Sequence, residues 1–346
     1  MKRFKKVLLA SLGVLLGLSL AGCGGNKSAS SSSGKKAASD FKVAMITSEG
    51  GLGDQSFNDS GNSGLKKAKK DLGVTTKVVE PSDVSEGETY LTQLAESGMN
   101  LIITLDLGHK DAIEKVAKKY PNTHFAIFNT VASGKNISSV MFKEQEASYL
   151  AGALAAQVTS DTSLKQVNDQ KVISFIGGID SPGINIFYTG YKAGAEAIDK
   201  NIQVLSGYSN SFGDPAKGKE VALSQINQGS DVVFQAAGGT GDGIIQAAKE
   251  KNVFAIGVDS DQDGIAKGNV LTSVMKRSDN AVYKLIQEGI KGKYDKELDL
   301  GLKEKGVELS PMKYTKDMIP KAYLDKVDQL RQQIIKGEIV VPDTRK

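Results

Sequence analysis

Short apolar runs alternate with longer segments in which apolar residues recur every three or four positions, from residue 41 to residue 336. The short runs are apolar on both faces, a pattern typical of strands buried in a parallel sheet. The longer segments carry one apolar stripe and predict amphipathic helices. Strands are expected at residues 41–47, 77–79, 101–105, 124–128, 172–176, 203–207, 231–236, 253–258 and 270–275. Helices are expected at residues 56–71, 86–97, 111–120, 144–160, 184–199, 217–228, 243–251, 278–291 and 323–336.

Strands and helices alternate in two successive series, the pattern of βαβ units that build parallel sheets. Together the series contain about 310 residues, more than a single hydrophobic core usually holds. We therefore predict an α/β protein with two lobes, the first formed by residues 40–145 and 275–297 and the second by residues 146–274 and 298–346. Ligands of open parallel sheets bind beyond the carboxyl ends of the strands. The residues that follow each strand are therefore the candidates for a cleft.

A basic and then apolar segment precedes the first predicted strand. Four cations lie within the first six residues, and the apolar run from Val7 to Ala21 has about 15 residues, short of the ~20 that span a bilayer as a helix. This arrangement is typical of an export signal. It ends at Leu20-Ala21-Gly22-Cys23, the pattern of a bacterial lipobox. Residues 1–22 are expected to be a lipoprotein signal peptide, and Cys23 is expected to anchor the chain by lipid on the extracytoplasmic face of a bacterial cell membrane. The alternative is a signal anchor with a free, buried cysteine.

Charge and cysteine content narrow the classes of partner. Residues 23–39 consist of glycine, serine, alanine and lysine apart from Cys23 and Asn26, which predicts a solvated tether. Without residues 1–22 the formal net charge falls from +4 to zero, so no excess of cations is left to attract nucleic acid. Once Cys23 is acylated, no thiol remains for a disulfide, a metal site or nucleophilic catalysis. We expect a monomer with no nucleic-acid partner.

Two segments imitate known ligand loops without completing them. Residues 213–219 follow the G-x-x-x-x-G-K pattern of a phosphate-binding loop, but Glu220 stands where serine or threonine would bind magnesium. Residues 259–264 open like a calcium-binding EF-hand loop, but the twelfth position is Val270 instead of glutamate. We therefore expect no nucleotide triphosphate, no calcium and no other metal or cofactor.

Catalytic groups are scarce along the chain. The two histidines, His109 and His124, begin a predicted helix and a predicted strand, and neither lies in a recognisable nucleophile–base or zinc motif. Carboxylates alone serve some glycosidases, and the sequence leaves that possibility open. The absence of a nucleophile–base pair favours a binding protein with no catalytic residue.

Two phenylalanines follow strands of different series, and both lie among small polar residues. Phe57 lies in the first turn of a predicted helix, and Phe212 lies in a loop of serine, asparagine and glycine. One ring from each lobe would enclose a flat heterocycle, an interaction that contributes ~1–3 kcal/mol per base. Asn129 follows another strand, and its amide both donates and accepts hydrogen bonds at a base edge. The alternative for Phe57 is that it packs inward.

Other strand ends supply groups for a polar ligand. Gly239 lies in a glycine-rich turn that lets backbone approach a ligand closely. Asp259 and Asp261 are able to accept hydrogen bonds from vicinal hydroxyls, as acidic residues do for ribose in dinucleotide folds. Lys276 is either a donor to the sugar and a partner of these aspartates, or a solvated lysine. Asp54 or Ser56 is expected to cap the helix that carries Phe57.

These residues lie in segments that resemble the basic membrane lipoprotein, or PnrA-like purine nucleoside receptor, family. The matching segments are 53–58, 125–129, 144–152, 212–218, 236–241, 257–262 and 272–276. They span most of the chain after the leader, in the order expected of the family. The resemblance implies a type I periplasmic-binding-protein fold, with two lobes on a three-stranded hinge, and delivery of nucleosides to an ABC permease.

Site roles carry over from the resemblance residue by residue. It implies that Phe57 and Phe212 sandwich the base and that Asn129 reads its edge. Asp54 and Asn58 would line the pocket, and Gly239, Asp259 or Asp261, and Lys276 would hold the ribose. Family members often have aspartate where this chain has Asn129, which predicts a base preference shifted or broadened toward pyrimidines.

The sequence thus predicts capture of a nucleoside, with a purine nucleoside as the first expectation, by closure of two lobes. Three alternatives stay open at this point. One is a sugar or other small-molecule receptor on the same fold, although the chain has no tryptophan of the kind that sugar sites use. The second is a nucleoside hydrolase, and the third is an adhesin or a sensor that signals to a membrane partner.

Overall fold

The computed structural model describes residues 40–345. The predicted signal peptide, Cys23 and residues 24–39 of the predicted tether lie outside the described residues, so these assignments stay predictions. Between residues 40 and 345, no helix combines the length and apolar content that crossing a bilayer requires.

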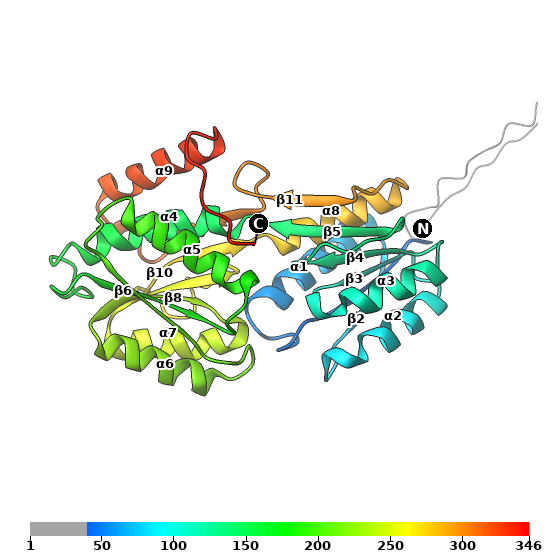
Figure 1. The fold of residues 1–346 in the computed structure, drawn as a ribbon, viewed down its shortest axis with the longest axis horizontal. Coiled ribbons are helices and arrows are strands. Elements are labelled where there is room, and N and C mark those ends of the chain that lie inside the picture. Colours follow the sequence, from blue (N-terminus) through cyan, green and yellow to red (C-terminus); the bar gives the residue numbers. More distant parts are fainter. Residues whose placement is uncertain (1–39, 346) are drawn as a thin grey trace, which may run out of the picture. The chain divides into compact units, whose positions relative to one another are not determined.

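The first sheet is parallel throughout and has the strand order β11-β5-β4-β3-β1-β2 (Figure 1). Its strands are β1 (Lys42–Ile46), β2 (Thr75–Val79), β3 (Leu101–Thr104), β4 (His124–Phe128), β5 (Ile137–Phe142) and β11 (Glu297–Leu300). Its helices are α1 (Phe57–Leu72), α2 (Gly87–Glu96), α3 (Lys110–Lys119) and α8 (Ser278–Ile290). Met45 packs in the same cluster as Leu65 of α1, whereas the next residue, Ile46, packs with Leu91 of α2. Helices therefore cover both faces, as the two-residue period of a buried strand requires.

The second sheet has the order β12-β10-β9-β8-β6-β7, parallel except that β12 runs antiparallel to β10 (Figure 1). Its strands are β6 (Val172–Gly177), β7 (Gln203–Tyr208), β8 (Ser230–Ala236), β9 (Phe254–Asp259), β10 (Val270–Lys276) and β12 (Val307–Leu309). Its helices are α4 (Glu144–Thr159), α5 (Pro182–Glu196), α6 (Pro215–Asn227), α7 (Gly241–Lys251) and α9 (Lys321–Ile335). The Phe234 ring of β8 lies 5.2 Å from the Tyr191 ring of α5, centroid to centroid, whereas Val233 packs with Ile244 of α7.

Between residues 40 and 345, consecutive elements change sheet at three places: β5 to α4, β10 to α8, and β11 to β12. Three strands of these crossovers, β5, β11 and β12, are missing from the sequence-based prediction. Ser138 and Ser139 interrupt the apolar run of β5, β11 alternates charged and apolar residues, and β12 has three residues. Since β11 pairs with β5, residues 298–300 belong to the first sheet and not to the second lobe, to which the sequence analysis assigned them.

Helices α4 and α5 approach closely because glycines lie at their contact. A methyl group added at Gly194 of α5 would lie 1.9 Å from the carbonyl oxygen of Tyr149 on α4, and one at Gly152 of α4 would lie 1.9 Å from that of Tyr191. Real carbon atoms do not approach an oxygen so closely. The two helices therefore fit at this distance only with glycine at these positions.

Candidate functional site

The Asp54 carboxylate organises the start of α1. It accepts hydrogen bonds from the backbone amides of Ser56 at 2.9 Å, Asn58 at 2.8 Å and Asp59 at 3.1 Å, all of which lack partners within the helix. Ser56 occupies the position before the helix but makes no side-chain capping bond. The sequence analysis did not decide between Asp54 and Ser56 as the cap of α1, and the structure shows that the cap is Asp54. Burial raises the pKa of Asp54, against the opposing effect of the three amides.

Asn58 is also occupied by its own lobe. Its side-chain oxygen accepts from the Ser48 backbone amide at 2.9 Å and from the Ser48 hydroxyl at 3.1 Å. The side chain is buried. The contribution of Asn58 to a cleft is therefore indirect, since it fixes the loop that follows β1.

Phe57 is half-buried, and a buried cation lies beside its ring. The ring centroid lies 6.4 Å from that of Phe128 and 4.8 Å from the Lys276 ammonium nitrogen. The same ammonium lies 5.1 Å from the Phe142 ring centroid. Phe57 thus packs partly on its own lobe, in line with the inward-packing alternative, and keeps part of its surface exposed.

Lys276 is buried, not solvated, and its partner is a residue that the sequence analysis did not single out. Its ammonium lies 2.9 Å from Glu144 Oε1, and Glu144 Oε2 lies 3.1 Å from the Arg345 guanidinium. Asp259 is buried nearby and accepts a 2.6 Å hydrogen bond from the Ser56 hydroxyl of the first lobe. Burial raises the pKa of Asp259 to about 6, although the Lys276 charge opposes the shift. The signal that could have identified Glu144 is its place just after the end of β5, in a segment that carries the family resemblance.

Phe212 is half-buried, and its loop lies against the first lobe. A methyl group added at Gly50 would lie 3.5 Å from the Phe212 carbonyl oxygen, and one at Gly239 would lie 3.4 Å from that oxygen and 3.8 Å from the Asp54 Cα. The ring lies over Gly178, where an added methyl group would be 2.3 Å from its Cε1 atom. The loop that precedes Phe57 and the loop that carries Phe212 are therefore neighbours.

Asn129 occupies the carboxyl end of β4 with a left-handed backbone, at φ 63°. Its backbone amide donates to the Val140 carbonyl at 2.8 Å, whereas its side-chain oxygen is buried and has no hydrogen-bond partner within residues 40–345. A buried acceptor without a donor costs folding free energy, which is consistent with an oxygen that accepts a hydrogen bond from a ligand.

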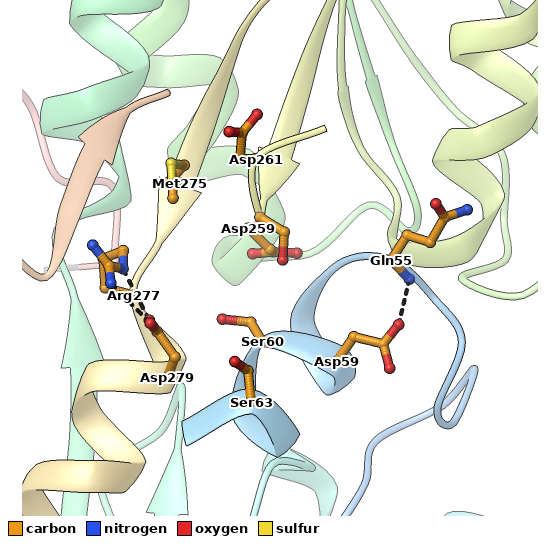
Figure 2. A pocket seen from close by; sticks show the side chains of 10 residues that line it. Gln55, Asp59, Ser60, Ser63, Asp259, Asp261, Met275, Arg277 and Asp279 are labelled. Carbon is orange, nitrogen blue, oxygen red and sulfur yellow. Dashed lines mark hydrogen bonds and ion pairs between the residues drawn. The ribbon is translucent and has the colours of Figure 1, made fainter. Parts of the chain in front are cut away.

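Asp261 is exposed and lies on a cavity of about 320 Å³ next to Asp259. Figure 2 shows Ser60 and Ser63 of α1 opposite these aspartates, with Arg277 and Asp279 paired at one side. The cavity is lined by Gln55, Asp59, Ser60, Ser63, Asp259, Ser260, Asp261, Met275, Arg277 and Asp279. Both lobes therefore contribute to it, and Ser60 and Asp259 are its buried members.

In the two segments that imitate ligand loops, residues 213–219 and 259–264, aspartates accept hydrogen bonds from other residues of the chain. Asp214 accepts from the Ala216 and Lys217 backbone amides and caps α6. Asp263 accepts from the Ser310 hydroxyl and the Lys313 amide, both at 2.8 Å. Within residues 40–345, no group of three or more histidine, cysteine or acidic side chains is placed to hold a metal ion.

Comparison with known proteins assigns the chain to a family. Residues 41–345 match the model of the family described as ABC transporter substrate-binding protein PnrA-like. The chain is 34% identical to the CD4+ T-cell-stimulating antigen of Listeria innocua, over 99% of both chains. It is 33% identical to the ABC transporter nucleoside-binding protein BmpA of Lactococcus lactis, over 97% of both chains.

A solved structure agrees with this assignment and with the predicted fold. The ABC transporter solute-binding protein of Aeropyrum pernix is 28% identical and superimposes with a TM-score of 0.80, covering 87% of this chain and 94% of that chain. The predicted two-lobed α/β fold of the type I class is thereby confirmed. The chain belongs to the PnrA-like family of ABC transporter substrate-binding proteins, which bind a solute and do not transform it.

Proposed function

We propose that the protein captures nucleosides, with purine nucleosides preferred, and delivers them to an ABC permease. It acts as a monomer on the extracytoplasmic face of the cell membrane, held there by a lipid on Cys23. The observation that carries the ligand assignment is the proximity of the loop that precedes Phe57 and the loop that carries Phe212, with Lys276 buried beside the Phe57 ring and Asp259 buried against Ser56.

The proposed base site uses the two rings and one amide. Planar bases stack favourably on aromatic faces, so a ring from each lobe would bury both faces of the ligand. The unpartnered side-chain oxygen of Asn129 would accept from a donor on the base edge, and its nitrogen would donate to an acceptor. This dual capacity supports binding of more than one kind of base.

The proposed ribose site uses Asp259 and Lys276, with the Gly239 turn close by. Asp259 is buried at the lobe junction and has a hydroxyl partner already, in Ser56. Ribose hydroxyls are donors of the same kind. Asp261 is exposed, so we assign the ribose contact to Asp259. Nucleotides should bind poorly because the carboxylates of Asp54 and Glu144 oppose a phosphate at this place.

Calorimetry with the purified protein tests the ligand assignment. We expect inosine or adenosine to bind, AMP to bind at least tenfold more weakly, and free ribose not to compete. Equal affinities for adenosine and AMP would contradict the assigned site, and competition by ribose would favour a sugar receptor. Mass spectrometry of the small molecules released on denaturation would identify the base directly.

The lipid anchor is supported by the leader pattern that ends at Cys23. Labelling of cells with a radioactive fatty acid should mark the wild-type protein and leave Cys23→Ser unmarked. An unmarked wild-type protein would remove the anchor and leave the ligand assignment unaffected.

A further inference from the structure

Two glutamines are buried at the ends of adjacent strands in the second lobe. Gln235 lies in β8 and has no exposed surface, and Gln262 follows β9 and is 1% exposed. An amide in such a place is stable only if its donors and acceptor find partners. The partners of Gln262 lie in both lobes.

Backbone amides decide how both side chains point. The Val258 amide donates to Gln262 Oε1 at 3.0 Å, and the Ala237 amide donates to Gln235 Oε1 at 3.0 Å. Since a backbone N–H only donates, the facing atom of each side chain is its oxygen. The nitrogen of Gln235 then donates to Gln262 Oε1 at 2.8 Å, and the nitrogen of Gln262 donates to the Gln55 carbonyl of the first lobe at 3.1 Å.

Two glycines make room for this pair. A methyl group added at Gly257 would lie 2.6 Å from Gln262 Oε1, and one added at Gly241 would lie 2.3 Å from Gln235 Oε1. Gly257 and Gly241 thus leave the two amides the space that they occupy.

The segment that receives the bond from Gln262 is held firmly by its own lobe. Gln55 has a left-handed backbone at φ 50°, and its amide donates to the Asp59 carboxylate at 3.0 Å (Figure 2). Further bonds join the segment to the second lobe: the Ser260 hydroxyl donates to the Ser56 carbonyl at 3.1 Å, and the Gln55 side chain donates to Asp242 at 2.9 Å.

The other end of the glutamine pair leads to the ring of the second lobe. Ala237, which donates to Gln235, directly precedes the 3₁₀ turn Gly238–Thr240. The Thr240 amide donates to the Phe212 carbonyl at 3.1 Å. One hydrogen-bonded series therefore connects Gln55 of the first lobe with the loop that carries Phe212.

We propose that Gln262 is a positioning residue that latches the two lobes together: its amide bonds the Gln55 carbonyl when the lobes close and, through Gln235, holds the turn that supports Phe212. The latch slows ligand release and takes no part in ligand entry. The kinetic part of this inference rests on the proposed nucleoside function, whereas the latch itself does not.

Gln262→Glu isolates the latch. The carboxylate keeps an acceptor for the Val258 amide and for Gln235, but it places a second oxygen against the Gln55 carbonyl, where a donor is needed. Closure is then opposed while the second lobe keeps its internal bonds. Protonation gives the glutamate a hydroxyl that donates to the carbonyl, so acid restores the latch. A defect that came only from disturbed packing would not recover with acid.

The kinetic experiment follows inosine release by stopped-flow measurement. Loss of one hydrogen bond between the lobes accelerates release about three- to tenfold, and a repulsive contact adds to this. We expect Gln262→Glu to release inosine at least about tenfold faster near pH 7.5, with the association rate changed less than about twofold. The difference from wild type should shrink toward pH 4.5. The exposed Gln246→Glu, on α7, is the matched control for charge and should behave as wild type.

Wild-type protein is measured over the same pH range because other groups near the latch titrate or carry charge. These are Asp54 and Asp59 on the α1 side, Asp242 on α7, Asp259, Asp261 and Asp263 around Gln262, Lys276 on β10 and Glu144 on α4. Only the change that Gln262→Glu shows beyond wild type counts for the latch.

A measurement without ligand separates this inference from the proposed function. In the full chain with Cys23→Ser, cysteines placed at the exposed positions Lys118 on α3 and Lys249 on α7 carry spin labels, one in each lobe. Pulsed electron spin resonance should show a larger share of long distances for Gln262→Glu than for wild type, and this share should fall with acid. If Gln262→Glu does not fold, Ser260→Ala, which removes a neighbouring bond between the lobes, should shift the distances in the same direction. Unchanged distances in the variant that folds, or in Gln262→Glu a shift that acid leaves untouched, would overturn the latch even if nucleosides bind. Failure of every nucleoside to bind, with the distance shift intact, would overturn the proposed function alone.

Discussion

Replacement of Glu144 by glutamine is the sharpest test of how the crossover between the lobes is stabilised. Glu144 begins α4 directly after the chain leaves the first sheet, and its two oxygens contact Lys276 at 2.9 Å and Arg345 at 3.1 Å. The Glu144 and Lys276 side chains are 3% and 6% exposed, so solvent does little to replace a lost partner. Glutamine keeps the shape but leaves the Lys276 ammonium without its closest anion.

Breaking a buried ion pair from one side costs roughly 3–5 kcal/mol of unfolding free energy. Asp259 still interacts with Lys276, and Asp343 still contacts Arg345, so we expect the lower end, about 3 kcal/mol. For the 306 residues from 40 to 345, with an unfolding entropy of about 2.1 cal/mol/K per residue, that corresponds to a fall in Tm of roughly 5 °C. Glu88→Gln, which breaks an exposed pair with Lys115, should cost at most about 1 kcal/mol and serves as the control.

Thermal and urea unfolding, followed by circular dichroism near neutral pH without ligand, measure both variants. The double variant Glu144→Gln with Lys276→Met removes both charges, and its loss should be smaller than the sum of the two single losses by at least about 1 kcal/mol. If Glu144→Gln is no less stable than Glu88→Gln, or if the double variant is strictly additive, then the pair does not stabilise the crossover and the reasoning is wrong.

Three further predictions concern the ligand, the pH dependence and the packing. Phe57→Ala and Phe212→Ala should each weaken nucleoside binding at least about tenfold, or 1.4 kcal/mol, by calorimetry; near-wild-type affinity in both would eliminate the sandwich. Burial lowers the pKa of His124 to about 4, below its usual 6.5, so the folded state binds fewer protons than the unfolded state in that range. The contribution of neutral His124 to the free energy of unfolding is therefore complete above pH 6.5 and is lost as the pH falls toward 4, by at most about 3 kcal/mol. Urea titrations of His124→Gln should show a correspondingly smaller loss of stability in acid, and an equal pH dependence of stability in wild type and variant would refute this prediction. Gly194→Ala should lose about 1–3 kcal/mol because α4 and α5 must separate, whereas Gly183→Ala, with no atom near the added methyl group, should not.

Most of the strands that the sequence located correctly are buried on both faces, although the partly exposed edge strand β7 was located as well. Runs such as residues 43–46 and 253–258 contain no polar side chain, as expected of strands in a parallel sheet that helices cover on both sides. β5, β11 and β12 were missed because serines, alternating charges or short length hide them. Their pairing depends on partners elsewhere in the chain: β11 joins the first sheet at β5, far from it in sequence.

Of the candidate site, the sequence identified residue types and strand ends but not their partners. Asp259 and Lys276 end strands β9 and β10, Phe57 begins α1, and Phe212 lies in the loop after β7, which are places where ligand groups are expected. That these four residues contact a ligand stays a prediction. Glu144 and Gln262 lie in segments that carry the family resemblance, but they were not singled out because their partners, Lys276 and Gln55, are distant in sequence. The proposed role of Gln262 depends on its hydrogen bond to Gln55, which is 207 residues away in sequence.

The amino-acid sequence alone determined the two-lobed α/β class and the family, since hydrophobic periodicity and short segments around strand ends are local properties of the chain. It also determined the expectation of a lipid-anchored leader, which lies outside the described residues. Only the tertiary structure decided that Asp54 rather than Ser56 caps α1, that Lys276 is buried against Glu144, and that two glutamines connect the lobes. The physical reason is that the pKa of a carboxyl group, the burial of a charge and the partner of an amide depend on atoms that folding brings together from distant parts of the chain.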